Sequence, residues 1–205
     1  MRRLHTVRKC PIRAVGQPLF AVRVPDAHLQ SGSDPVPVGI FSGAAFRLGH
    51  TLVNEQLIRL DNRGDTLSFG SIHIKDAFFN PNIIQGENGI APIFKGMATQ
   101  MQQTFDHKVV NTLRNFLFGP PGAGGLDLVA LNIQRARERG FPDYNTVRET
   151  FGLDRLTDFT QITKNKTLAA DLDSVYKDIN IVDPWVGMIC EDIDAENGLH
   201  TGTTI

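Results

Sequence analysis

The chain has 205 residues, of which 41% are hydrophobic and 21% are charged, and its formal net charge at pH 7 is −1. This balance is typical of a folded globular protein rather than a disordered one, and the near-neutral charge gives no global attraction to nucleic acid or to an anionic membrane. No apolar run approaches the ~20 residues that span a bilayer. The basic N-terminus lacks the apolar centre of a secretory signal, so the compartment stays unassigned. Two cysteines, Cys10 and Cys190, indicate neither a disulfide framework nor a cysteine metal site.

The first part of the chain predicts an irregular extension followed by a helical domain. Residues 1–38 contain several Pro and Gly residues and no sustained period, so we place the domain at 39–205. Between Ala44 and about Asp61, apolar residues recur at steps of three and four, which predicts one amphipathic helix. A turn is expected at 61–65, a short helix at 74–79 and two helices within 90–118.

The second part of the chain starts with a strong breaker, GPPGAGG at 119–125. We expect a helix in LDLVALNIQRARERG, at 126–140, that stops at Gly140 and Pro142. Further helices are expected within 143–153, 167–180 and 183–192. There is no alternation of strands and helices, no clear hairpin and no internal repeat, so the predicted fold is mainly α, with little or no sheet.

His50 is the first candidate for chemistry. On the predicted helix, Arg47 and His50 are three residues apart and share a mostly apolar face. A cation and an imidazole on such a face need partners, and two kinds would serve: a carboxylate from elsewhere in the chain, or a ligand that is apolar in its body and anionic at its rim. Haem is a ligand of the second kind, with an iron that takes an axial histidine and propionates that pair with arginine. From the spacing alone, a structural histidine is the more common explanation.

Asn132 and Arg135 form a similar pair on the second helix. They are again three residues apart, with leucines and isoleucine around them. A buried asparagine needs a partner, and Asn132 could accept the ring N–H of a metal-bound histidine, while Arg135 could reach a propionate. The alternative is an ordinary amphipathic helix whose arginines lie in solvent.

Two long blocks of the sequence together resemble a known family. AAFRLGHTLVNEQLIRLDNRG, at 44–64, and LDLVALNIQRARERGFPDYNTVRE, at 126–149, are similar to segments of the animal-type haem peroxidases, the myeloperoxidase and peroxidasin superfamily with its bacterial members. The blocks occur in the family's order. TKNKTLAADLDSVYKDINIVDPWVGMICED, at 163–192, resembles the segment that follows. The resemblance covers about three quarters of the chain.

The resemblance implies a role for four residues. His50 occupies the position of the proximal ligand of the haem iron, and Asn132 matches the asparagine that hydrogen-bonds the proximal imidazole. Arg47 and Arg135 match arginines near the propionates. The related fatty-acid oxygenases carry a tyrosine shortly before the proximal histidine, whereas Arg47-Leu48-Gly49 stands here, which favours the peroxidase branch.

The sequence departs from the family's pattern within QRARERG, at 134–140. The family has Gly between the first two arginines and Asp-His before the final Gly, where this chain has Ala136, Glu138 and Arg139. An alanine in place of glycine favours a helix, so it argues against neither the fold nor haem contact.

The resemblance implies oxidation of a small-molecule donor by hydrogen peroxide, a reaction associated with oxidative stress. No catalytic residue of the distal side is recognisable, so we expect a proximal-side fragment. DIDAENG, at 192–198, lacks the glycine and glutamate of a calcium loop, so calcium is not supported. Helices of a partial domain expose apolar faces, so we expect association with another chain through such a face. The alternatives are a non-catalytic haem-peroxidase remnant that binds haem or a partner, and, more weakly, a fatty-acid oxygenase.

Overall fold

The computed structural model describes residues 39–85, 89–120 and 122–193. About half of these residues are helical, and the one sheet among them has two short strands, so the mainly α fold is confirmed. The chain divides into two compact units, residues 1–48 with 132–205 (unit 1) and residues 49–131 (unit 2). None of the helices in the described ranges is long and apolar enough to cross a membrane.

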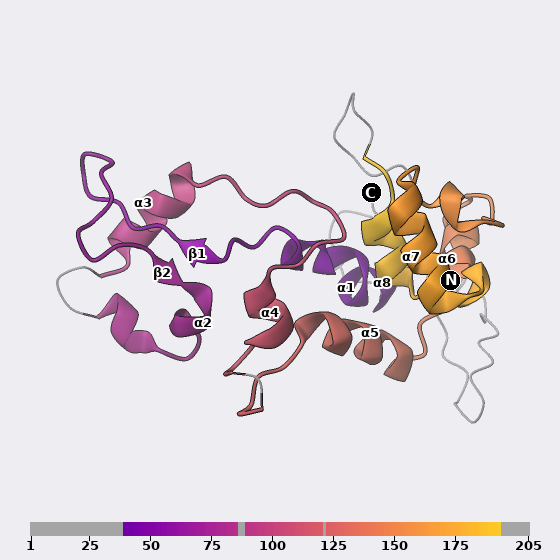
Figure 1. Cartoon of the computed structure of the whole chain (residues 1–205), viewed down its shortest axis with the longest axis horizontal. Coiled ribbons are helices and arrows are strands. Elements are labelled where there is room, and N and C mark those ends of the chain that lie inside the picture. The colour runs from indigo at the N-terminus through magenta and orange to yellow at the C-terminus, as the bar shows by residue number, and fades with distance from the viewer. Residues whose placement is uncertain (1–38, 86–88, 121, 194–205) are drawn as a thin grey trace, which may run out of the picture. The chain divides into compact units, whose positions relative to one another are not determined.

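Unit 1 is built around helices that pack closely in the C-terminal part of the chain (Figure 1). Helix α6 (Tyr144–Thr150) contacts α8 (Pro184–Cys190), and α7 (Lys166–Tyr176) contacts the 3-10 turns η3 (Phe159–Gln161) and η4 (Ile179–Ile181). The contact between α6 and α8 needs Gly187, because a Cβ at this position would lie 2.3 Å from the Tyr144 ring. The buried core of these elements includes Tyr144, Val147, Leu172, Val182, Trp185 and Met188.

The start of unit 1 is a short helix, α1 (Gly39–Gly43), followed by the 3-10 helix η1 (Ala45–His50). Helix α5 (Leu128–Glu138) belongs to this unit from Asn132 onward.

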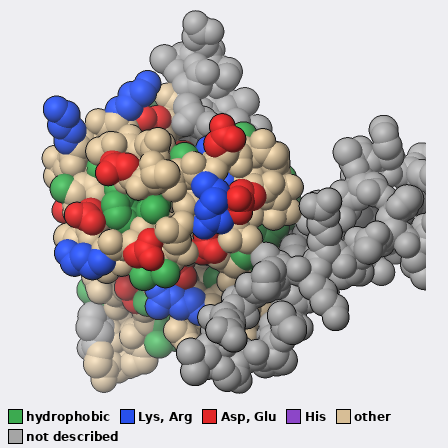
Figure 2. Space-filling model, turned by 90° about the vertical axis from the view of Figure 1, so that its right-hand side faces the viewer, with side chains coloured by type: hydrophobic (Ala, Val, Ile, Leu, Met, Phe, Trp, Pro, Cys, Tyr) green, Lys and Arg blue, Asp and Glu red, His purple; other side chains and the backbone are tan. Residues whose placement is uncertain are grey.

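On the face of the molecule seen in Figure 2, acidic and basic side chains are interspersed and apolar groups form only small patches. This mixed surface is typical of a face exposed to solvent.

Unit 2 contains the small sheet. Strands β1 (Gln56–Leu57) and β2 (Ile72–His73) pair antiparallel, with Gln56 opposite His73. Helix α3 (Ala91–Thr99) packs on β1, and α2 (Ile74–Ala77) contacts β2 and α4 (Asn111–Asn115) (Figure 1). The 3-10 turn η2 (Pro81–Ile84) completes the elements of this unit. Its buried apolar residues are Leu60, Ile72, Ile74, Ile93, Val109, Leu113 and Leu117.

The segment from Ala44 to Asp61 is not one helix, and this prediction was wrong. The chain is helical only to His50 and then runs into β1. Gly49 and the β-branched residues Thr51 and Val53 lower helix propensity. Residues 56–57 pair with β2, so Leu57, one of the apolar residues that the helical period had counted, lies in a strand instead. Tertiary pairing has overridden the periodic pattern.

The other predicted elements lie where the sequence places them. The turn at 61–65 is held by the Asp61 carboxylate, which accepts from the backbone N–H groups of Arg63 (2.7 Å) and Asp65 (2.9 Å). The helix expected at 74–79 is α2, the two expected within 90–118 are α3 and α4, and the later helices are α5 to α8. The strand pair was not predicted, because two-residue strands show no alternation. The extension at 1–38 and most of the segment 192–198 lie outside the described residues.

Candidate functional site

Helix α5 presents one stripe of residues that combines burial with positive charge. Asn132 and Ala136 are buried, whereas Arg135 and Arg139 are exposed. These positions are spaced by three and four residues, so they lie along one side of the helix. The helix begins where the Asp127 carboxylate accepts from the N–H groups of Val129 (2.8 Å) and Ala130 (3.2 Å), an N-terminal cap.

The end of α5 is fixed by a Schellman motif. The N–H of Gly140 donates to the carbonyl of Arg137 (3.0 Å), and the N–H of Phe141 donates to the carbonyl of Ala136 (3.0 Å). Gly140 has φ +66°, a conformation that favours glycine. This turn directs Phe141 back toward the first helix of the unit.

The Phe141 ring connects α5 to α1. It packs so closely on Gly43 that a Cβ there would lie 2.2 Å from the ring. The backbone continues from α1 into η1, where the N–H of Arg47 donates to the carbonyl of Ala44 (2.9 Å). Phe141 therefore sets the position from which the Arg47 side chain approaches the buried stripe of α5.

Arg47 and Asn132 meet directly. Nη1 of Arg47 donates to Oδ1 of Asn132 over 2.7 Å. Nε of Arg47 is also buried, and it has no hydrogen-bond partner in the part of the chain that the structure describes. Burial, together with the positive charges of Arg135 and Arg139, lowers the pKa of the Arg47 guanidinium from its usual value. The group nonetheless stays charged at neutral pH, because arginine does not lose its proton in proteins.

A second contact holds α5 from a different side. Arg137 donates from Nε (2.9 Å) and Nη2 (2.6 Å) to the two carboxylate oxygens of Asp183, which precedes α8. The Tyr176 hydroxyl of α7 donates to the same carboxylate over 2.8 Å. The hydrogen bond to Asp183 raises the pKa of Arg137 despite partial burial. Asp183 therefore ties α5 to α7 and α8.

His50 is the last residue of η1 and is half-buried. It belongs to unit 2, whereas Arg47, Asn132 and Arg135 belong to unit 1, and each is described within its own unit. Within unit 1, Arg47 donates to Asn132 and feels the charge of Arg135, so these three residues come together on one side of α5. No group of three or more His, Cys, Asp or Glu side chains in the described ranges could hold a metal ion by itself.

The sequence model of the animal haem peroxidase family matches residues 18–205. The chain belongs to this family. The matched span includes residues 18–38, which the composition places in the extension, and the boundary at 38 stays a prediction.

Relatives within the animal haem peroxidases are much longer than this chain. It is 35% identical over 152 residues to peroxinectin A of Dictyostelium discoideum, covering 74% of this chain and 28% of that protein. It is 36% identical over 169 residues to human eosinophil peroxidase, covering 80% of this chain and 24% of the relative. The solved structure of peroxidase A from Dictyostelium discoideum superposes with a TM-score of 0.75 at 32% identity, covering 81% of this chain and 32% of that one.

The fold is shared more widely than the sequence. A fatty acid alpha-dioxygenase from Oryza sativa superposes with a TM-score of 0.64 at 20% identity, covering 81% of this chain and 29% of that one. At this identity the likeness concerns the fold alone, because folds are shared by proteins with different functions.

Several residues of the site were not found by sequence reasoning. The Asp183 carboxylate was missed because its partner Arg137 is 46 residues away in sequence and nothing local pairs them. The approach of Phe141 to Gly43 was missed for the same reason. Arg139 was noted only as a departure from the family's pattern, although its spacing of four from Arg135 already placed it on the same helix face.

Proposed function

We propose that the chain provides the proximal side of a haem site in a peroxidase that oxidises small-molecule donors with hydrogen peroxide. Membership of the family supports this activity, but the chain spans 28% of peroxinectin A and 24% of human eosinophil peroxidase, so the activity of the whole protein is inferred. Bound haem would supply the iron at which peroxide is reduced while a donor is oxidised.

The observation that carries the proposal is the charge of the Arg47 region. A partly buried guanidinium whose buried Nε has no partner among the described residues, and which feels the charge of a second arginine on α5, is unfavourable without an anion. Carboxylates are the planar partners that guanidinium groups bind best. Haem carries two such groups at the edge of an apolar ring, so the residues present fit it.

In this proposal each residue has one role. His50 binds the iron through an imidazole nitrogen, and Asn132 accepts the other ring N–H, which fixes the tautomer. The amide oxygen of Asn132 accepts from Arg47 in the structure, and an amide oxygen has two lone pairs with which to accept. Arg47 and Arg135 bind the propionates.

Titration of the full chain with haemin tests the role of His50. We expect a shift of the Soret band in the wild-type chain, loss of the shift in His50→Gly, and its recovery when imidazole is added to that variant. His107→Gly is the matched control, because this histidine lies elsewhere in the chain and should keep the shift. The same spectrum from the wild-type chain and His50→Gly would refute ligation by His50.

Activity is measured separately from binding. Donor oxidation with hydrogen peroxide by the haem-loaded chain tests the peroxidase function, and product analysis with a fatty acid tests the oxygenase alternative. Haem binding without turnover would identify the non-catalytic alternative for this chain.

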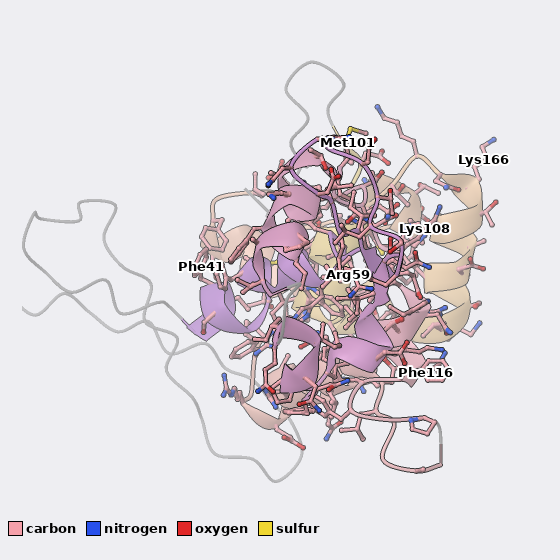
Figure 3. All side chains as sticks on the ribbon, turned by 90° about the vertical axis from the view of Figure 1, so that its left-hand side faces the viewer. Phe41, Arg59, Met101, Lys108, Phe116 and Lys166 are labelled. Atoms are coloured by element: carbon pink, nitrogen blue, oxygen red, sulfur yellow. The ribbon has the colours of Figure 1, made fainter. Side chains whose placement is uncertain are left out.

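We also propose that a second copy of this chain covers the apolar face of α3. Phe94 and Met97 are more than half exposed, and Met101 just beyond the helix is 86% exposed and lies at the edge of unit 2 (Figure 3). Exposed apolar groups of this size promote association. A concentration-dependent mass in sedimentation experiments that is abolished by Phe94→Ser with Met97→Ser supports the proposal, and an unchanged mass contradicts it.

A further inference from the structure

Arg139 is four residues after Arg135, so the two lie on the same side of α5, and the positive charge of Arg139 acts on Arg47. The N–H of Arg139 donates to the carbonyl of Arg135 over 3.1 Å, so it continues the helical register by one residue beyond Glu138. It is exposed, and the Schellman motif at Gly140 fixes its backbone. The family's pattern has histidine at this position, where this chain has arginine.

Arg47, Arg135 and Arg139, which we call the arginine face, have no acidic partner among the residues that the structure describes. Within residues 39–85, 89–120 and 122–193, none of the three guanidinium groups makes a salt bridge or donates to a carboxylate. Arg137 in the same helix is paired with Asp183, which shows that a carboxylate from another segment does reach α5. Three positive charges therefore act on one side of the helix without compensation from these residues.

The position of Arg139 at the end of α5 offers a simpler explanation for an unpaired cation at this residue. A cation at a helix C-terminus is stabilised by the helix dipole, and this accounts for Arg139 considered alone. It does not account for the buried and unpartnered Nε of Arg47, nor for the repulsion that Arg139 exerts on it. A bound anion accounts for all three observations.

We infer that Arg139 is a third cation of the arginine face and that this face binds a ligand with two carboxylates. The inference rests on the proposed function, in which Arg47 and Arg135 already bind the propionates of haem. Arg139 would then add positive charge at the exposed end of the face. Arg139 is a binding residue and not a catalytic one.

Iron-free protoporphyrin IX is the probe, because it has both carboxylates and no metal for His50 to bind. Its fluorescence is titrated with the full chain and with Arg139→Gln, Arg139→Lys and Lys166→Gln. Lys166 begins α7 and is not among the groups that act on Arg47, so Lys166→Gln makes the same change in net charge elsewhere in unit 1. The fluorescence of Trp185, the single tryptophan, verifies that each variant is folded.

We expect Arg139→Gln to weaken binding by about 3- to 10-fold, the range of one partly exposed charged contact. Arg139→Lys should retain most of the affinity, and Lys166→Gln should bind like the wild-type chain. The difference between the wild-type chain and Arg139→Gln should shrink at high salt, and it should vanish for the dimethyl ester of the porphyrin.

Three results would overturn the inference: equal affinities for Arg139→Gln and Lys166→Gln, a loss in Arg139→Lys as large as in Arg139→Gln, or no binding by the wild-type chain. The proposed function can fail separately. If haemin gives no ligation by His50 while porphyrin binding depends on Arg139, the arginine face stands and the iron ligand does not.

Discussion

Replacing Asp183 by asparagine should destabilise unit 1 and loosen α5. The Asp183 side chain is 7% exposed and accepts three hydrogen bonds, two from Arg137 and one from Tyr176. A hydrogen bond to a charged group contributes about 1.5–3 kcal/mol. Because the Arg137 side chain is 58% exposed, solvent screens its share. Asparagine also keeps one acceptor, so we expect a loss of about 2 kcal/mol.

Urea denaturation followed by Trp185 fluorescence measures this loss. The tryptophan is 1% exposed and lies two residues after Asp183, so its emission reports on unit 1. With a slope of about 2 kcal/mol per molar urea, the midpoint should fall by about 1 M. Haemin affinity should fall as well, since α5 carries Asn132 and Arg135.

The control is Glu149→Gln, which removes an ion pair on the surface of the same unit. Glu149 pairs with Arg155 over 2.7 Å, and the two side chains are 51% and 39% exposed. Such a pair contributes about 0–1 kcal/mol, so its midpoint should move by less than half as much. Equal midpoints for the two variants would refute the role of Asp183 in holding α5.

Two further predictions concern other contacts. Gly43→Ala should lower the urea midpoint of unit 1 and weaken haemin binding, because the added Cβ would overlap the Phe141 ring. Gly39→Ala is the control, since its Cβ would make only an ordinary 3.6 Å contact with that ring and should be tolerated. A Gly43→Ala variant as stable as the wild-type chain would contradict the close contact. Glu55→Gln should speed hydrogen exchange of the Thr112 amide, which donates to the carboxylate over 3.1 Å. Although desolvation opposes it, hydrogen bonding from Thr112 keeps the pKa of Glu55 below its usual 4.5. The ionised Glu55 carboxylate therefore stabilises the fold above pH 4.5, and this stabilisation is lost as the pH falls through the lower pKa of Glu55 in the folded chain. In strong acid the Thr112 amide should exchange at the same rate in the wild-type chain and in Glu55→Gln. A difference in rate that grows as the pH falls would refute this pH dependence.

Local signals in the sequence were sufficient for most helices and for the ends of α5. The cap at Asp127 and the stop at Gly140 are encoded within a few residues, and the structure has both. The segment after His50 was misread, because its apolar period fits a helix while its strand partners lie about sixteen residues further on. Periodicity contains no information about such a partner.

In the candidate site, too, the sequence predicts some features and not others. Arg47, Asn132 and Arg135 could be named from spacing and family resemblance, and the structure brings these three together. What the sequence could not supply is the environment of each group. That the Arg47 Nε lacks a partner, and that Asp183 holds the helix from another side, depend on contacts between distant segments.

The central claim is that His50 binds the haem iron. Electron paramagnetic resonance of the chain loaded with ferrous haem and nitric oxide tests it most directly. Nitric oxide binds one side of the iron, and the spectrum then reports a nitrogen ligand on the other side through its hyperfine splitting. The account predicts this splitting in the wild-type chain and in His107→Gly, and its loss in His50→Gly. A splitting that persists in His50→Gly would show that another residue is the ligand and would contradict the account.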